Sequence, residues 1–418
     1  MANKGIHTDQ KNIIFPFFTI LIFLNSSHLF PLKIKPPRTI PFTGKTKLFE
    51  VYFSYNLLNS LHKFYLIYEV QFKNYPKSKY INCELLQNKI ALETTNSELL
   101  SELTPEEWYK DIQDLKNNFP HKILVGSIMG DAKNRNQWIE MALGCQDAGV
   151  DFLELNFSCP HGYPAKGKGA AIGQDPEYSA MITQWLKEDS RIKVPIIPKM
   201  TPAITNISSI GEAVANAGAD GICAVNTFPV IMGFNLRTLK PKPDVGGYTT
   251  AGGMSGASLK PVALRCVNDL VENPGLPVMA CGGISSGFDA VEFMLLGAPV
   301  VQVCTEVMLK GYSIISKMKK DVSRFMEWHG YSSVKEFIGL GTGLTAQYSE
   351  LDQNFKVTPS VDPVKCNGCQ VCFVSCRDGG YQAIEMKEHL AVIIKDRCSG
   401  CSLCFQVCPL DAIQMVEN

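Results

Sequence analysis

The chain has 418 residues, of which 45% are hydrophobic, so it can bury one large core or several smaller ones. Its 40 basic side chains balance 40 acidic ones, which leaves no large positive field to attract a nucleic acid or an anionic membrane. Eight of the 15 cysteines lie between Cys366 and Cys408. This clustering favours metal binding in a reducing compartment, the cytoplasm, over a secreted disulfide scaffold.

Residues 1–94 read as an atypical N-terminal segment. Within 13–31, the apolar run IIFPFFTILIFL has the length of a signal-peptide core and is too short to span a bilayer comfortably. A proline interrupts the run and no small-residue cleavage site follows it. We therefore expect a divergent paralogue or a wrongly assigned gene start rather than a membrane anchor. Two strand-like runs, 49–55 and 64–72, are candidates for the first two strands of the next domain.

From about residue 100 onward, apolar runs alternate with amphipathic stretches. The expected strands are residues 122–128, 151–157, 194–200, 220–227, 277–283 and 299–304. The expected helices are residues 134–148, 175–188, 206–217, 260–272, 286–296 and 306–328. Because the strands are apolar throughout rather than alternating, they are typical of a parallel sheet covered by helices on both faces.

Six consecutive strand–helix units indicate an α/β fold, a (β/α)₈ TIM barrel whose first two strands are not recognised with certainty. A doubly wound open sheet is the alternative. Polar or reactive residues follow the strands, as expected where a barrel builds its site. We expect the barrel over 95–328, a linker over 329–360 and a separate module over 361–418.

The C-terminal module contains CNGCQVCFVSC and, later, CSGCSLCFQVCP. Each segment has the spacing C-x₂-C-x₂-C-x₃-C, which is typical of a ferredoxin that carries two [4Fe–4S] clusters, with each fourth cysteine serving the other cluster. Zinc sites use CxxC pairs separated by a longer loop. Arg377 stands where the second repeat has Pro409, which changes a local turn rather than the ligands. The expected ligands are Cys366, Cys369, Cys372 and Cys408 for one cluster, and Cys398, Cys401, Cys404 and Cys376 for the other.

A barrel joined to a one-electron module needs a cofactor that accepts single electrons and delivers a hydride, and flavin does both. Gly282–Gly283 and Cys304–Thr305 follow the last two strands, where barrels commonly bind phosphate. Lys199 could stabilise the reduced flavin near its N1. A double glycine alone indicates no more than a tight turn, but together these residues favour FMN.

Several motifs resemble the FMN barrel of the dihydropyrimidine dehydrogenases. They are NSELLSELTPEEW (96–108), NFSCPHG (156–162), KMTP (199–202), AVNT (224–227), GGMSG (252–256), CGGI (281–284) and QVCT (302–305). The resemblance covers residues 95–418, ferredoxin-like tail included, but not 1–90. Dihydroorotate dehydrogenases share part of the barrel pattern, but they usually carry SCPN where this chain has His161.

The resemblance implies a reductase for the 5,6 double bond of uracil and thymine in pyrimidine catabolism. Amides and hydroxyls suit the alternating C=O and N–H groups of that ring. By position, the substrate-binding residues would be Asn96, Glu98, Asn156, Ser158, Asn226 and Thr227. The FMN-binding residues would be Lys199, Ser255, Gly256, Cys281, Gly282, Gly283, Cys304 and Thr305.

Cys159 is the expected proton donor. It has no neighbouring cysteine for a disulfide and no second ligand for a metal, and it precedes a glycine-rich loop, 161–173. The resemblance implies hydride transfer from reduced FMN to C6 and proton transfer from this thiol to C5, with the loop closing over the ring. A thiol with an ordinary pKa near ~8.5 is mostly protonated at neutral pH and can act as an acid.

No dinucleotide-binding fingerprint is recognised, because GLGTG (339–343) does not follow a strand and open a helix. FAD and NAD(P)H are therefore expected on a partner subunit or on a further N-terminal half, in a homodimer or hetero-oligomer. Two alternatives remain open. One is an enzyme that oxidises dihydroorotate, and the other is a non-catalytic iron–sulfur carrier with a degenerate barrel.

Overall fold

The computed structural model describes residues 103–158, 170–352, 355 and 357–417, together with the backbone of four strands nearer the N-terminus. The chain divides into two compact units, Met1–Leu344 and Thr345–Asn418. Cys159 and the loop 161–169 lie outside the described residues.

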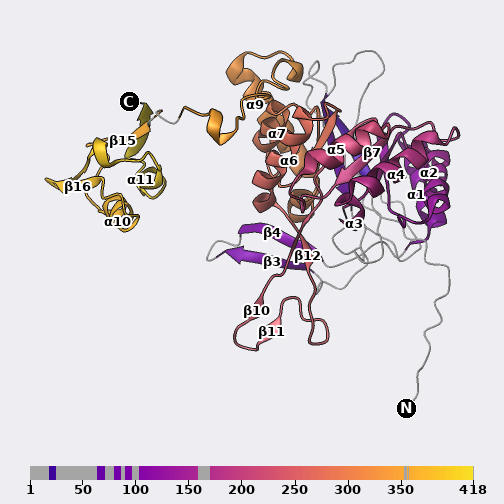
Figure 1. Cartoon of the computed structure of the whole chain (residues 1–418), viewed down its shortest axis with the longest axis horizontal. Helices are drawn as coiled ribbons and strands as arrows, with labels where there is room; N and C mark the ends of the chain where they lie inside the picture. Colours follow the sequence, from indigo (N-terminus) through magenta and orange to yellow (C-terminus); the bar gives the residue numbers. More distant parts are fainter. Residues whose placement is uncertain are drawn as a thin grey trace. The chain divides into compact units, whose positions relative to one another are not determined.

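The first unit contains a closed eight-stranded barrel, so the α/β barrel expected from the sequence is confirmed (Figure 1). Parallel strands with intervening helices account for most of the ring. In order around the barrel the strands are β1 (Phe18–Leu24), β2 (Phe64–Val70), β14 (Val300–Val303), β13 (Val278–Cys281), β8 (Ile222–Ala224), β7 (Ile196–Met200), β6 (Phe152–Asn156) and β5 (Ile123–Ile128).

Strand β1 departs from the expected pattern. It lies in the apolar stretch 13–31 and pairs antiparallel with both β2 and β5. An antiparallel ladder satisfies the backbone groups of its neighbours as well as a parallel one, so this strand can still close the ring. The expected strand at 64–72 is present as β2, whereas 49–55 lies outside the described residues. None of the helices described in the chain is long and apolar enough to cross a membrane.

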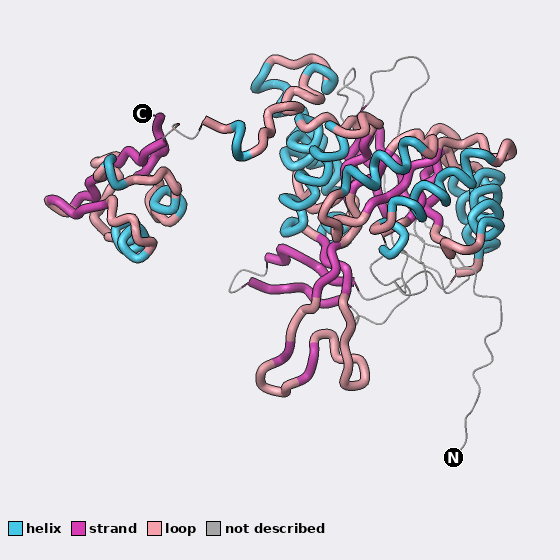
Figure 2. Tube along the Cα trace, viewed as in Figure 1, coloured by secondary structure: helices cyan, strands magenta, loops and turns pink. Residues whose placement is uncertain are grey.

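Helices surround the described barrel strands (Figure 2). They are α1 (Pro105–Asn118), α2 (Arg135–Ala148), α3 (Ala170–Gly173), α4 (Pro176–Glu188), α5 (Ile207–Asn216), α6 (Lys260–Glu272), α7 (Gly287–Leu295), α8 (Thr305–Lys310) and α9 (Ser313–His329). The single helix expected over 306–328 is instead two helices. Gly311 adopts a left-handed φ of 73° between them, which ends α8 because a helix cannot continue through that conformation.

The barrel strands β5, β6, β7, β8, β13 and β14 are buried on both faces, and successive side chains alternate between the two faces. Leu124, Leu153 and Val301 belong to the large core shared with the helices. Val125, Ile197 and other residues at alternate positions form a separate cluster, which we place inside the barrel. The same alternation brings polar residues into the interior near the carboxyl ends of the strands. This is the end at which barrels build their sites.

The long segment between β8 and α6 contributes two strands to a small antiparallel sheet outside the barrel, and two strands from before residue 100 complete that sheet. Its order is β3 (Tyr80–Leu85), β4 (Ile90–Asn96), β12 (Gly252–Ser255) and β9 (Phe228–Val230). The two-residue strands β10 (Phe234–Asn235) and β11 (Lys240–Pro241) form a hairpin beyond it (Figure 1). The 3₁₀ turn η3 (Ala257–Leu259) then leads into α6.

The division between the units falls within the expected linker 329–360. Val334 and Phe337 are buried in the core of the first unit, around the short turn η4 (Val334–Glu336). GLGTG (339–343) follows this turn and not a strand. After η5 (Tyr348–Glu350) the chain enters the second unit.

The second unit is a pseudo-symmetric α+β module. Its elements are β15 (Val357–Val361), α10 (Val371–Asp378), β16 (Ile384–Lys387), β17 (Leu390–Ile393), η6 (Lys395–Arg397), α11 (Leu403–Gln406) and β18 (Ile413–Glu417). β15 pairs with β18 and β16 with β17, both antiparallel. Its small core includes the cysteines themselves, with Cys372 and Cys404 packed beside Ile384 and Ile413.

Candidate functional site

A cavity opens at the carboxyl ends of β7, β8, β13 and β14. Its empty volume is about 860 Å³, with the solvent at its mouth included. It brings together all eight residues expected to bind FMN, as well as Asn226 and Thr227 from the expected substrate set. The eight are Lys199, Ser255, Gly256, Cys281, Gly282, Gly283, Cys304 and Thr305.

The double glycine after β13 forms one wall of the cavity by close backbone packing. Gly283 has a φ of 74°, and a Cβ at this position would lie 2.4 Å from the backbone nitrogen of Lys260. Side chains are therefore excluded here, and bare backbone borders the cavity. Across it, Thr305 Oγ1 lies 2.8 Å from Ser255 Oγ. Bare backbone and two hydroxyls suit a phosphate group, so the residues present fit FMN.

Ion pairs hold together the starts of the two helices beside this turn. Lys260 Nζ lies 2.6 Å from both Asp289 and Glu292. Burial by itself raises the pKa of the Asp289 carboxyl, but hydrogen bonds from Lys260, Ser285 and Ser286 outweigh it and hold that pKa below its usual value. Ser286 and Asp289 also form the capping box of α7. The carboxylate thus links the starts of α6 and α7.

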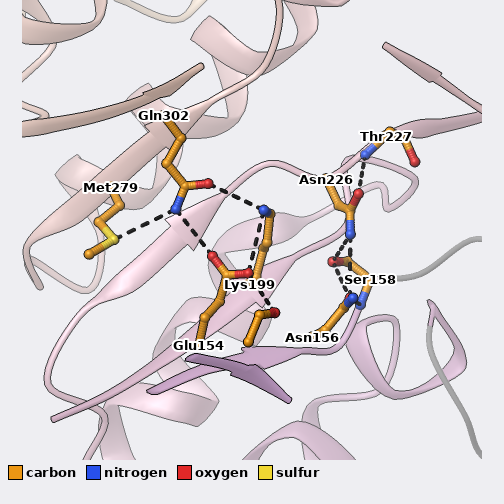
Figure 3. A network of polar contacts seen from close by, with 9 residues as sticks. Glu154, Asn156, Ser158, Lys199, Asn226, Thr227, Met279 and Gln302 are labelled. Atoms are coloured by element: carbon orange, nitrogen blue, oxygen red, sulfur yellow. Dashed lines mark hydrogen bonds and ion pairs between the residues drawn. The ribbon is translucent and has the colours of Figure 1, made fainter. Parts of the chain in front are cut away.

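Lys199 lies on the floor of the cavity within a buried polar network (Figure 3). Its ammonium group is 3.2 Å from Gln302 Oε1 and 3.5 Å from Glu154 Oε1. Gln302 Nε2 donates to Glu154 Oε2 at 3.1 Å, and Ser127 Oγ donates to Glu154 Oε1 at 2.9 Å. Strands β5, β6, β7 and β14 each supply one member of this network.

A second polar network joins the tips of β6 and β8 (Figure 3). Asn226 Nδ2 donates to Ser158 Oγ at 2.9 Å and lies 3.4 Å from Asn156 Oδ1. The Asn156 oxygen also accepts from the Ser158 backbone at 3.1 Å. Asn226 Oδ1 accepts from the backbone N–H of Thr227 at 2.7 Å. Amides and hydroxyls at two strand tips are thus held in one fixed arrangement.

The remaining expected site residues are placed differently. Asn156 and Ser158 are fully buried and contact Asn226, but they do not line the cavity. Asn96 lies at the end of β4, where its backbone pairs with Gly253 of β12. Glu98 and the expected proton donor Cys159 lie outside the described residues.

Sequence reasoning missed Glu154, Gln302 and Ser127. Glu154 lies in the apolar run of the expected strand 151–157. A lone carboxylate in such a run indicates a buried partner, because an unpaired buried charge is costly. Gln302 lies within the QVCT motif, which by itself assigns it no role. Both side chains find their partners on other strands. The sequence can therefore show that a polar residue stands in an apolar run, but it cannot show which residue it contacts.

The second unit contains two cavities, each surrounded by four cysteines from both repeats. One is lined by Cys366, Cys369, Cys372 and Cys408, and the other by Cys376, Cys398, Cys401 and Cys404. Among the described residues no three ligands converge closely enough for a single ion. Backbone N–H groups of Ala383, Gly400 and Ala412 point to the sulfurs of Cys376, Cys398 and Cys408.

Burial raises the pKa of buried cysteines in both units. Burial, reinforced by the neighbouring thiols, raises the pKa of Cys404 to about 11, a penalty that a coordinating metal reverses by deprotonating the thiol. By contrast, burial alone raises the pKa of Cys145 to about 12. Cys266 behaves similarly, with its pKa raised to about 11, mainly by burial. These two single cysteines are therefore inert core residues.

A barrel with a cavity suited to FMN, together with a module holding two four-cysteine cages, defines an iron–sulfur flavoprotein oxidoreductase. A family model described as dihydroorotate dehydrogenase matches residues 100–326, and one described as a 4Fe-4S dicluster domain matches 359–415. The chain belongs to the dihydropyrimidine dehydrogenase family, and its barrel matches the family model of the dihydroorotate dehydrogenases. Its cofactors are FMN and two [4Fe–4S] clusters.

Individual relatives agree with this placement. The NAD-dependent dihydropyrimidine dehydrogenase subunit PreA of Escherichia coli strain K12 is 37% identical over 296 residues, which are 70% of this chain and 71% of the relative. The chloroplastic dihydropyrimidine dehydrogenase (NADP(+)) of Arabidopsis thaliana is 38% identical over 250 residues, 58% of each chain. The catalytic subunit of dihydroorotate dehydrogenase B (NAD(+)) from Pyrococcus abyssi is 37% identical over 235 residues, 56% of this chain and 73% of the relative.

A solved structure shares the fold. The dihydroorotate dehydrogenase of Eimeria tenella, crystallised with ferulenol, superposes with a TM-score of 0.51 at 20% identity. The superposition covers 64% of this chain and 75% of the Eimeria chain. At this identity the likeness supports the barrel alone. The two family models and the relatives support a dehydrogenase.

Proposed function

We propose that this chain is the catalytic part of a dihydropyrimidine dehydrogenase, which reduces the 5,6 double bond of uracil or thymine. The observation that carries the proposal is the bond between Asn226 and Ser158 beside the cavity. It holds amide and hydroxyl groups ready for a ring edge that alternates C=O and N–H. The match to PreA covers 296 residues, more than the expected barrel over 95–328 contains. It therefore also supports a dihydropyrimidine dehydrogenase.

The proposed roles fall on residues that contact the ring and on one proton donor. Asn226 and Thr227 border the cavity and orient the ring, with Asn156 and Ser158 holding Asn226 from behind. Asn96 and Glu98 are proposed as further ring contacts. Bound FMN supplies the hydride that reaches C6 of the ring. Cys159 gives its thiol proton to C5, so the double bond gains one hydride and one proton and becomes saturated.

Lys199 places a positive charge at the cavity floor, where negative charge develops on a reduced flavin. Electrons reach the barrel through the second unit. Its two clusters are assigned to Cys366, Cys369, Cys372 and Cys408, and to Cys398, Cys401, Cys404 and Cys376. We propose that a partner carrying FAD and NAD(P)H supplies these electrons, in keeping with the word "subunit" in the name of the PreA relative.

A dihydroorotate-oxidising enzyme is the second candidate, because the matching family model and the Pyrococcus relative carry that name. Turnover of the purified flavoprotein with uracil and with dihydroorotate separates the two candidates, using a chemical reductant or oxidant in place of the partner. We expect reduction of uracil and no oxidation of dihydroorotate. The reverse preference would replace the proposal with the second candidate.

The role of Cys159 is tested by Cys159→Ala. We expect loss of uracil turnover by at least about 100-fold, in line with the usual contribution of a positioned acid, with the flavin content unchanged. Cys145→Ala is the matched control, because Cys145 is buried in α2 and packs behind β5, and it should retain turnover. Full activity of Cys159→Ala would remove this residue from the mechanism.

A further inference from the structure

The network below the cavity contains one charged residue that the proposed chemistry does not use. Glu154 lies in β6 and is 1% exposed, as are Lys199 and Gln302. Lys199 and Gln302 line the cavity, whereas Glu154 is not among its lining residues and contacts both of them (Figure 3). Both charges are therefore removed from water, yet only the lysine faces the space where a flavin fits.

The surroundings of Glu154 demand a residue that only accepts hydrogen bonds. Ser127 Oγ and Lys199 Nζ approach Oε1, at 2.9 and 3.5 Å, and Gln302 Nε2 donates to Oε2 at 3.1 Å. An ionised carboxylate has two acceptor oxygens and no donor, so it satisfies all three groups. A glutamine here would turn an N–H₂ group toward at least one donor and break that contact.

The contacts close into a ring. Lys199 Nζ is held by Glu154 and by Gln302 Oε1, while the same Gln302 amide is oriented by its own bond to Glu154. The carboxylate thus fixes the lysine directly and through the glutamine. Buried ion pairs add little net stability compared with apolar packing, so stability alone does not account for this pair.

We propose that Glu154 is a positioning residue that sets where the Lys199 ammonium lies at the cavity floor and thereby sets how strongly this site favours reduced over oxidised flavin. Glu154 acts through Lys199 and does not touch the flavin. The inference rests on flavin binding by this cavity and not on the identity of the pyrimidine substrate. Failure of the uracil assay would leave it intact.

The test compares the dissociation constants of oxidised and reduced FMN in the full-length holoprotein. They are measured by anaerobic ultrafiltration, and the released flavin is quantified after reoxidation. In Glu154→Gln we expect the ratio of the oxidised to the reduced constant to fall about tenfold, equivalent to ~30 mV for a two-electron couple. Glu154→Asp, which keeps the charge but withdraws it by one methylene, should lower the ratio in the same direction.

The decisive comparison repeats the substitution in a Lys199→Met background. If Glu154 acts through the lysine, Glu154→Gln should cause no further change there. An equal change in both backgrounds would overturn the proposal, because the carboxylate would then act on the flavin by its own field. That field effect also has the opposite sign, since removing a negative charge favours reduced flavin, so a rise in the ratio would overturn it too.

A purely structural role is tested by the same measurement. An unchanged ratio in folded, flavin-binding Glu154→Gln would rule out the positioning role. Thr183→Val controls for the loss of a buried hydrogen bond remote from the cavity, in α4, and should leave the ratio unchanged. If Glu154→Gln does not fold, Ser127→Ala carries the test. It removes one donor to the same oxygen and should lower the ratio less, and only when Lys199 is present.

Discussion

Lysine side chains are buried in two different settings in the barrel unit. Lys199 lies between acceptors from two residues of other strands, Glu154 and Gln302, and its charge is compensated. Lys122, which precedes β5, is half-buried near Lys319 of α9. Burial, with a smaller contribution from Lys319, lowers the pKa of Lys122 to about 8. The first lysine belongs to the site, whereas the second carries a stability cost.

Lys122 therefore makes stability depend on pH. Between about pH 8 and the ordinary lysine pKa near ~10.4, the unfolded chain binds more protons than the folded one, so stability rises with pH. Below pH 8 both states are charged and the whole penalty applies. Because the group is half-exposed, removing its charge should raise the free energy of unfolding by at most ~1 kcal/mol. Lys122→Met should therefore raise Tm at pH 7 by ~2–4 °C.

The gain from Lys122→Met should shrink as the pH approaches 10, as followed by thermal melts at several pH values. Lys193→Met is the matched control. Lys193 also precedes a barrel strand but is exposed, so its Tm change should not vary with pH. A gain for Lys122→Met that stays constant from pH 7 to pH 10 would contradict the electrostatic explanation.

Among the elements, the turn between β13 and α7 was the best predicted part of the site. Two glycines after an apolar run indicate a tight turn at the expected place, and the structure has them at positive φ. The sequence could not show that Gly283 lies against the start of α6, because Lys260 is 23 residues away in the chain. Only the packing of two neighbouring strand–helix units brings them together.

Gly283→Ala should lower the free energy of unfolding by more than ~3 kcal/mol, because backbone strain adds to a clash with the Lys260 backbone. It should also weaken FMN binding by displacing the cavity wall. Urea denaturation and flavin titration measure the two effects. Gly275→Ala is the matched control: it has a φ of 80° with no atom within 4 Å, so only strain of ~1–2 kcal/mol applies. Equal losses in the two variants would show that the contact with α6 is unimportant.

For the whole molecule, the two units should respond differently to the loss of iron. The core of Thr345–Asn418 is small and contains the cysteines themselves, so cluster binding contributes to its folding. Anaerobic oxidation with a chelator should abolish the cooperative melting of this unit, while the barrel unit keeps its FMN and its own transition. Calorimetry and flavin content, compared with a mock-treated sample, check this. Loss of FMN together with the clusters would contradict independent folding.

Sequence patterns alone predict the order of strands and helices after residue 100, the two-cluster cysteine spacing and half of the residues around the cavity. These features are local or repeat at fixed intervals, so a single chain reveals them. How the barrel closes depends on tertiary structure. Strand β1, which lies in a stretch with the length of a signal-peptide core, pairs antiparallel with β2 and β5. Tertiary structure also decided the partners of Glu154, because contacts between strands depend on register, which no local pattern specifies.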